Sequence, residues 1–307
     1  MLTRAQIDPV VTAALAEDAP WGDLTGEVFL PAGATATAQL TAREDGVLAG
    51  IDVVAAAFRL TDPATELTAH RADGDRFTTG EVLATVTGPA RAVLQAERIA
   101  LNLVQRMSGI ATATRAMVDA VEGTGARITD TRKTTPGLRA LERHAVRCGG
   151  GVNHRFSLSD AVMAKDNHLA VLAQQGVDLT EAIRRARARL GHTTRLEVEV
   201  DRLDQIEPVL AGGVDILMLD NFSLADLAAG VRQVAGRAIV EASGTVTLDT
   251  VGDIARTGAD VISSGALTHS ARHLDLGLDM TVAAGADGAA RADSAAGAAG
   301  TVEAAGA

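Results

Sequence analysis

The chain of 307 residues has little cysteine and few aromatic residues. A single cysteine, Cys148, excludes an internal disulfide and fits a reducing compartment. One tryptophan, five phenylalanines and no tyrosine leave aliphatic side chains to fill the core, and they offer few platforms for stacking nucleic-acid bases. The formal charge of -11 also argues against a nucleic-acid partner, because such proteins present a basic face.

Long apolar runs are missing as well. No stretch of the sequence approaches the roughly 18 apolar residues that a membrane span requires. The first residues, MLTRAQIDPVV, lack the apolar segment of a signal peptide. We therefore expect a cytoplasmic protein that has neither a membrane nor a nucleic acid among its partners.

Lysine is the scarcest basic residue, and its two occurrences lie close together. Lys133 and Lys165 both fall within residues 130–168, whereas the other 26 of the 28 basic residues are arginines. A lysine ammonium is a compact point charge suited to phosphate or a reacting centre, whereas guanidinium suits planar carboxylates. Arg132, His154 and Arg155 lie in the same segment. This cationic cluster in an acidic chain predicts a pocket for a small anion.

The first part of the chain has an α+β pattern. Apolar residues at helical spacing predict a helix over 4–17. Strand-like segments follow near 34–42, 64–70 and 82–87. Two helices are then expected, at 90–106 and 110–122, with Ser108-Gly109 closing the first.

From residue 126 the pattern becomes an alternation of strands and helices, which indicates a parallel sheet covered by helices. The six expected strands are 127–131, 161–165, 195–200, 214–219, 238–242 and 260–264. Two of the intervening helices begin with cap signals, Asp178 with Glu181 and Ser223 with Asp226. After Met280 the composition shifts to Ala, Gly, Asp and Ser, and we expect 284–307 to be a disordered tail without function.

Polar residues follow each of the six expected strands. They are Arg132-Lys133, Asp166-Asn167, Glu199-Val200-Asp201, Asp220-Asn221, Ser243-Gly244-Thr245 and Gly265-Ala266. A β/α barrel places its site at the carboxyl ends of its strands, and a doubly wound open sheet does the same. Both folds remain open at this point, and both predict one site at these strand ends.

Several long segments resemble the quinolinate phosphoribosyltransferase family. They are EDAPWGDLT (17–25), ERIALN (97–102), SGIAT (108–112), DTRKTTPGLR (130–139), GGGVNHR (149–155), KDNH (165–168), EVEVD (197–201), LDNF (219–222) and GALTHS (265–270). The resemblance runs from about residue 8 to residue 281. It implies an α/β fold with an N-terminal α/β sandwich (1–110, joined by 270–283) and a C-terminal open six-stranded, TIM-barrel-like α/β barrel (111–269).

The resemblance also implies an activity and a set of partners. Quinolinate and phosphoribosyl pyrophosphate would give nicotinate mononucleotide, pyrophosphate and carbon dioxide, in the de novo synthesis of NAD. Magnesium is the implied cofactor, with Glu199 and Asp220 helping to position it. Family members are homodimers, in which Arg98 would enter the partner's site, and assembly into a hexamer is left open.

Site residues follow from the same resemblance. The implied catalytic residues are Lys133, Lys165, Glu199 and Asp220. The implied substrate-binding residues are those four together with Arg98, Thr131, Arg132, His154, Arg155, Ser243, Gly244, Thr245, Ser264, Gly265, Ala266 and His269. Two positions depart from the family pattern: Thr245 stands where a glycine is usual, and Ser264 stands where valine is common.

Two other functions remain open from the residues alone. A lysine that ends a barrel strand, such as Lys165, could form the imine of a Schiff-base aldolase. A regulatory protein of the same fold would bind quinolinate without releasing pyrophosphate.

Overall fold

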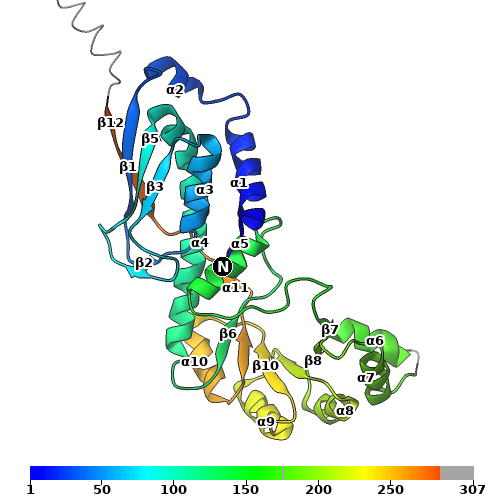
Figure 1. Ribbon diagram of the computed structural model, residues 1–307. Coiled ribbons are helices and arrows are strands. Elements are labelled where there is room, and N and C mark those ends of the chain that lie inside the picture. The colour runs from blue at the N-terminus through cyan, green and yellow to red at the C-terminus, as the bar shows by residue number, and fades with distance from the viewer. Residues whose placement is uncertain (175, 284–307) are drawn as a thin grey trace, which may run out of the picture. The chain divides into compact units, whose positions relative to one another are not determined.

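The computed structural model describes residues 1–174 and 176–283, which form two units (Figure 1). The first unit comprises Met1–Ser108 together with residues 273–283, and the second comprises Gly109–Arg272. The tail predicted at 284–307 lies outside the described residues. Within the described part of the chain, no helix combines the length and the apolar character needed to cross a membrane.

The first unit is built on a four-stranded antiparallel sheet in the order β12-β1-β5-β3. Its strands are β1 (Thr35–Ala42), β3 (Glu66–Ala69), β5 (Val82–Pro89) and β12 (Leu276–Ala283). Along β1, Ala36, Ala38 and Leu40 are buried and alternate with exposed side chains, as expected of a strand with one face on a core. Strand β12 pairs with β1 through Ala283, so the regular structure continues past Met280.

Helices cover one face of this sheet (Figure 1). They are α1 (Arg4–Asp18), α3 (Ile51–Thr61) and the beginning of α4 (Ala90–Ala120). Val53, Val54 and Phe58 of α3 are buried. The short helix α2 (Leu24–Phe29) and the two-stranded pair of β2 (Gly46–Val47) and β4 (Arg76–Phe77) complete the unit. The strands and the first helix expected here are present, whereas α3 was not predicted.

The expected break at Ser108-Gly109 is wrong, because α4 is one continuous helix from Ala90 to Ala120. Glycine costs a helix only about 1 kcal/mol relative to alanine. Met107, Ile110 and Ala111 are all buried around this point, and their packing outweighs that cost. The Ser108 hydroxyl is buried too and accepts the N–H of Ala49 at 3.1 Å.

The second unit contains a six-stranded, fully parallel sheet in the order β6-β11-β10-β9-β8-β7. Its strands are β6 (Arg127–Thr129), β7 (Val162–Ala164), β8 (Leu196–Val200), β9 (Ile216–Asp220), β10 (Ile239–Ser243) and β11 (Val261–Ser263). All six predicted strands are therefore present. Strands β7 to β11 are neighbours in sequence order, and β6 pairs with β11 without any reversal of order. A doubly wound sheet would reverse at a switch point, so the open barrel is confirmed.

Helices connect successive strands of this barrel (Figure 1). They are α5 (Arg139–Cys148), α6 (Asp166–Gln174), α7 (Leu179–Ala188), a 3-10 turn (Leu203–Gln205), α8 (Ile206–Gly212), α9 (Leu224–Val234) and α10 (Leu248–Arg256). The short helix α11 (Ala266–His269) follows the last strand, β11. The two predicted caps are present: Asp178 accepts the N–H of Glu181 at 3.0 Å, and Ser223 accepts that of Asp226 at 3.1 Å. These short connections bring the carboxyl ends of all six strands to one end of the barrel.

Candidate active site

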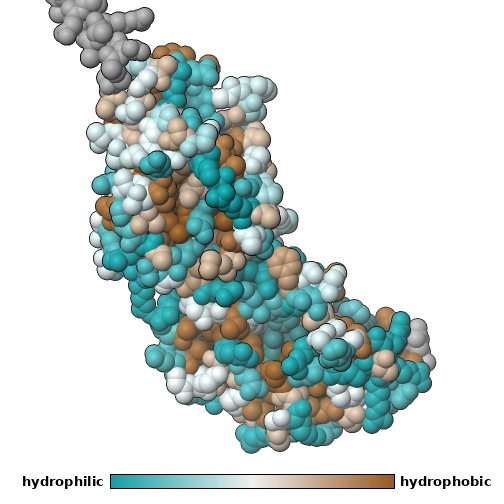
Figure 2. Space-filling view, in the orientation of Figure 1, coloured by the Kyte–Doolittle hydropathy of each residue, from teal (hydrophilic) through white to brown (hydrophobic). Residues whose placement is uncertain are grey.

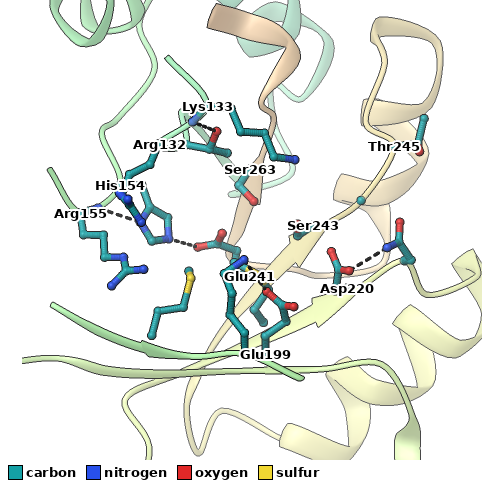
Figure 3. Close-up of a pocket in the computed structure, with 16 residues that line it drawn as sticks. Arg132, Lys133, His154, Arg155, Glu199, Asp220, Glu241, Ser243, Thr245 and Ser263 are labelled. Carbon is teal, nitrogen blue, oxygen red and sulfur yellow. Dashed lines mark hydrogen bonds and ion pairs between the residues drawn. The ribbon is translucent and has the colours of Figure 1, made fainter. Parts of the chain in front are cut away.

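A cavity of about 550 Å³ opens at the carboxyl ends of the strands. Eleven of the sequence-predicted site residues line it: Thr131, Arg132, Lys133, His154, Arg155, Lys165, Glu199, Asp220, Ser243, Gly244 and Thr245. Figure 3 shows Arg132, His154 and Arg155 on one side, facing Asp220, Ser243 and Thr245 on the other. The cavity therefore places cations opposite carboxylates and a glycine-containing turn.

The remaining predicted residues do not line this cavity. Arg98 is exposed on α4, in the first unit. Ser264 is buried, and its N–H donates to the carbonyl of Thr129 at 3.1 Å, so that N–H is already committed. Gly265, Ala266 and the exposed His269 lie next to the cavity, at the start and end of α11.

Gly265 nevertheless shapes the cavity through Lys133. A Cβ at Gly265 would lie 2.7 Å from Cδ of Lys133, so the lysine side chain packs directly over this glycine. The carbonyl of Lys133 accepts the hydroxyl of Thr268 at 2.8 Å, which ties the loop after β6 to α11. The absence of a side chain at Gly265 thus gives Lys133 its path into the cavity.

Lys165 follows β7 and forms an ion pair with a carboxylate of the neighbouring strand. Its Nζ lies 3.3 Å from Oε2 of Glu199 on β8. The Lys165 side chain is 48% exposed and that of Glu199 is 14% exposed, so the pair stands at the edge of the cavity. An ammonium in this position can transfer its contact from Glu199 to an arriving anion.

The turn after β10 needs an unusual backbone. Gly244 has φ +136°, and a Cβ there would lie 2.7 Å from Oδ1 of Asn221. Asn221 itself adopts φ 58°, in the left-handed region that asparagine tolerates. The close approach of these two loops permits only glycine at 244, and it leaves the turn 243–245 lining the cavity.

His154 lies between two buried carboxylates beneath the cavity. Its Nε2 is 3.2 Å from Oε2 of Glu197 on β8 and 3.4 Å from Oε2 of Glu241 on β10. Burial lowers the pKa of His154, but hydrogen bonds and charges from the two glutamates outweigh burial and raise this pKa to about 10. The two glutamates thus favour a doubly protonated, cationic imidazole. The backbone N–H of Arg155, however, donates to Nδ1 at 2.7 Å, which requires a lone pair on Nδ1 and therefore no proton there. Both observations place a proton on Nε2.

Asp130 anchors the backbone on which His154 lies. This fully buried carboxylate accepts the N–H of His154 at 2.8 Å and the side-chain amide of Asn153 at 2.6 Å. Arg143 of α5 lies 3.4 Å away. Burial raises the pKa of Asp130 above its ordinary value, although these hydrogen bonds and Arg143 pull it in the other direction.

Five residues that line the cavity were not predicted. They are Met163, Met218, Asn221, Glu241 and Ser263. Glu241 and Glu197 are buried carboxylates in strands whose other buried residues are apolar. The rule that charge in a barrel core requires an explanation could have identified both glutamates. The methionines had no such signal, because apolar residues are expected in strands.

Comparison with known proteins identifies the family of this chain. Family models named Quinolinate phosphoribosyl transferase, N-terminal and C-terminal domain, match residues 23–108 and 110–279. A nicotinate-nucleotide pyrophosphorylase [carboxylating] of Mycobacterium leprae is 44% identical, covering 91% of this chain and 100% of its own. A probable enzyme of that name from Bacillus subtilis is 39% identical, covering 92% and 96%.

Solved structures give the same result. The crystal structure of NadC from Streptococcus pyogenes superposes with a TM-score of 0.87 at 42% identity, covering 92% of this chain and 99% of that one. The nicotinate-nucleotide pyrophosphorylase of Francisella tularensis gives a TM-score of 0.85 at 33% identity, covering 92% and 98%. The two matched domains and the overall fold are shared with these proteins, and the chain belongs to the quinolinate phosphoribosyl transferase family.

Proposed function

We propose that this protein transfers the phosphoribosyl group of phosphoribosyl pyrophosphate to quinolinate and releases pyrophosphate and carbon dioxide, giving nicotinate mononucleotide for NAD synthesis. The observation that carries this proposal is the meeting of Arg132, Lys133, Arg155 and Lys165 in one cavity of a chain of this family. The single cysteine fits the reducing cytoplasm as the place where the protein acts.

Quinolinate is a flat pyridine with two adjacent carboxylates. The forked guanidinium groups of Arg132 and Arg155 match the shape and charge of such a dianion. Each charge-assisted hydrogen bond contributes roughly 1.5–3 kcal/mol. Arg132 Nε is buried and has no hydrogen-bond partner among the described residues, so it can donate to a carboxylate of the ligand without giving up a bond within the protein.

In the transfer step the ring nitrogen of quinolinate forms a bond to C1 of the ribose as the bond from C1 to pyrophosphate breaks. Positive charge develops on the sugar and negative charge on the leaving group, so fixed charges supply most of the catalysis. Lys133 and Lys165 neutralise the pyrophosphate or the C2 carboxylate, and Glu199 and Asp220 hold the ribose hydroxyls. The ring nitrogen is then cationic; the C2–carboxylate bond breaks, carbon dioxide leaves, and C2 takes a proton.

Magnesium would be held at the carboxylate side of the cavity. Glu199 and Asp220 both line the cavity, and carboxylate oxygens are the ligands that this hard cation prefers, so the donor set fits. When bound, the ion would neutralise charge on the pyrophosphate group.

The 5′-phosphate would lie on the turn formed by Ser243, Gly244 and Thr245. Backbone N–H groups and hydroxyls of such a turn bind phosphate without a charged side chain. The second implied loop contributes less, because the Ser264 N–H already donates to Thr129. Gly265 and Ala266 remain as its candidate donors.

A homodimer would complete the site through Arg98. On α4, Arg98 lies one turn after the exposed Leu94, and the nearby segment exposes Trp21, Leu24 and Phe29 at 94%, 75% and 79%. Figure 2 shows hydrophobic surface over α2, where two of these residues lie. Exposed aromatic side chains of this size mark an interaction surface. A second copy that covers this patch would also receive Arg98.

Activity is tested by incubating the protein with quinolinate, phosphoribosyl pyrophosphate and magnesium and by measuring nicotinate mononucleotide and carbon dioxide. Nicotinate serves as the control substrate, because it lacks the C2 carboxylate. Efficient turnover of quinolinate with little turnover of nicotinate is expected. Equal use of both acids would contradict a dianion pocket, and trapping of Lys165 by borohydride with a carbonyl substrate would point to an aldolase.

The shared site is tested by mixing Arg98→Ala and Lys133→Ala subunits. In a random population of dimers, about a quarter of the sites would combine an intact barrel with an intact Arg98, so that fraction of the activity should return. No recovery in dimers shown to be hybrid would refute the contribution of Arg98 across subunits.

A further inference from the structure

Three side chains from three elements form a polar layer between the cavity and the opposite end of the barrel. His154 comes from the segment between α5 and β7, Glu197 from β8 and Glu241 from β10. The two glutamate side chains are only 4% exposed, and that of His154 is 11% exposed. Here His154, Glu197 and Glu241 occupy positions that aliphatic side chains usually fill in a barrel core.

Both ring nitrogens of His154 are engaged by the protein. Nδ1 accepts the N–H of Arg155 at 2.7 Å, and the proton on Nε2 is shared by the two carboxylates. Figure 3 shows the ring directed toward Glu241 and the backbone of Arg155. Neither nitrogen is then left to bind a substrate, which differs from the direct contact implied for His154 by the family resemblance.

The contact at Nδ1 fixes the residue that does face the substrate end of the cavity. Arg155 makes two hydrogen bonds of its own. Its backbone N–H donates to Nδ1 of His154, and its side-chain Nη1 donates to the carbonyl of Ala161 at 2.8 Å. Its own carbonyl accepts Nη1 of Arg143 at 3.3 Å. The orientation of Arg155 therefore depends on a backbone whose position is set partly by the His154 ring.

Charge supports the same dependence. Burial lowers the pKa of Arg155, the nearby Arg132 lowers it further, and Glu197 acts in the opposite direction. Two guanidinium groups that share a cavity repel each other until a dianion arrives. A carboxylate beneath them reduces that cost in the ligand-free protein.

The layer borders a cavity on its other side as well. A second cavity, of about 400 Å³, lies at the amino ends of the strands and is lined by Arg127, Arg195, Ile216, Ile239 and Val261. His154, Arg155 and Glu241 line both this cavity and the first one. Because these side chains border a cavity on both sides, we expect the contacts of Nε2 with the two carboxylates to contribute more to the position of the imidazole than packing does.

We propose that Glu197 and Glu241 are positioning residues for the dianionic substrate: they hold the imidazole of His154, which in turn fixes the backbone of Arg155 so that its guanidinium meets a carboxylate of the ligand. This inference rests on the proposed function and deepens it. It assigns to His154 a supporting place and to Arg155 the direct contact.

The test compares Glu241→Gln with Glu241→Leu, and Glu197→Gln with Glu197→Leu. Glutamine keeps an oxygen that can accept the Nε2 proton, whereas leucine removes it at similar volume. The KM for quinolinate should rise about 3-fold or less in the Gln variants and about 10-fold or more in the Leu variants. The KM for phosphoribosyl pyrophosphate and kcat at saturation should stay within about 2-fold of wild type.

Glu207→Gln is the matched control, because Glu207 is exposed and pairs with Arg237 away from the cavity. The control should leave all three kinetic constants unchanged. A parallel loss of kcat and of affinity for both substrates in the Leu variants would indicate a general structural defect and overturn the proposal. If a Leu variant does not fold, the Gln variants still test the proposal through their KM values and through calorimetric titration with quinolinate. A Gln variant that weakens the binding of both substrates equally overturns the proposal.

A crystal structure of Glu241→Leu separates this inference from the proposed function. Loss of the Arg155–Ala161 contact is expected whether or not the wild type turns over quinolinate. An unmoved His154 and Arg155 would overturn the inference while leaving the function intact. Stoichiometric divalent metal in the wild-type protein that is lost from the variants would also overturn it, because the three side chains would then be metal ligands.

Discussion

Replacing Gly244 with alanine tests the proposed phosphate turn most directly. Gly244 has φ +136°, and an added Cβ would lie 2.7 Å from Oδ1 and 3.3 Å from the backbone of Asn221. An alanine at φ +136° is strained, and the close approach of Asn221 leaves the two loops little room to move apart. Strain of this kind costs about 1–3 kcal/mol.

The cost should appear as lost affinity for the phosphorylated substrate. At 1.4 kcal/mol for each factor of ten, it corresponds to a rise of about 5- to 150-fold in the KM for phosphoribosyl pyrophosphate. Because Arg132 and Arg155 lie across the cavity from this turn, the KM for quinolinate should change by less than about 3-fold.

Gly213→Ala is the control for backbone strain without contact. Gly213 has φ +87°, no atom lies within 4 Å of the position that an added Cβ would take, and the residue does not line the cavity. Both variants should lose thermal stability, but only Gly244→Ala should lose affinity for phosphoribosyl pyrophosphate in steady-state assays. Equal kinetic effects in the two variants, or an unchanged KM in Gly244→Ala, would refute a phosphate site at this turn.

Three further predictions concern single residues. Lys165→Ala should lower kcat/KM by about 10²-fold or more with an unchanged melting temperature, and Lys165→Arg should not restore kcat/KM. Wild-type turnover by the Lys165→Ala variant would show that Lys165 takes no part in the mechanism. Burial acts to raise the pKa of Asp215, but hydrogen bonds from the N–H of Leu196 and from Arg187 outweigh burial and hold this pKa below its ordinary 3.8. Asp215→Asn weakens these hydrogen bonds and should therefore cost about 1–3 kcal/mol at pH 7. That stabilisation is present above pH 3.8 and is lost as the pH falls through the folded-state pKa, so urea unfolding of the two proteins should converge in acid; a constant difference would contradict it. Ser108→Ala should cost about 1–3 kcal/mol in urea unfolding, because it leaves the N–H of Ala49 without its hydroxyl acceptor, and a neutral effect would show that this bond adds nothing.

Local pattern was sufficient for most of the fold. The six strands of the barrel were predictable because buried parallel strands are short, apolar and bounded by turn residues. The break at Ser108-Gly109 was wrong because burial around Met107 and Ile110 overrides the low helix propensity of glycine. Strand β12 was not predicted, since its residues find their partners in β1, more than two hundred positions away along the chain.

The site was predicted less evenly. Motif resemblance identified Lys133, Lys165 and Asp220, all of which line the cavity. It also included Ser264, whose N–H is taken up by Thr129, and it missed Glu241. These outcomes depend on contacts between distant segments of the chain. Such contacts determine which backbone N–H groups already have a partner and which buried carboxylates lie beside one histidine.

The sequence by itself determined the alternation of strands and helices, the place of polar residues at the strand ends and the family. These features depend on the identity of residues and on their spacing along the chain. Only the tertiary structure decided the order of the sheet, the pairing of Lys165 with Glu199 and the enclosure of His154 between Glu197 and Glu241. The physical reason is that hydrogen bonds and burial act over a few ångströms in space, whereas the residues concerned stand from 20 to 134 positions apart in the chain.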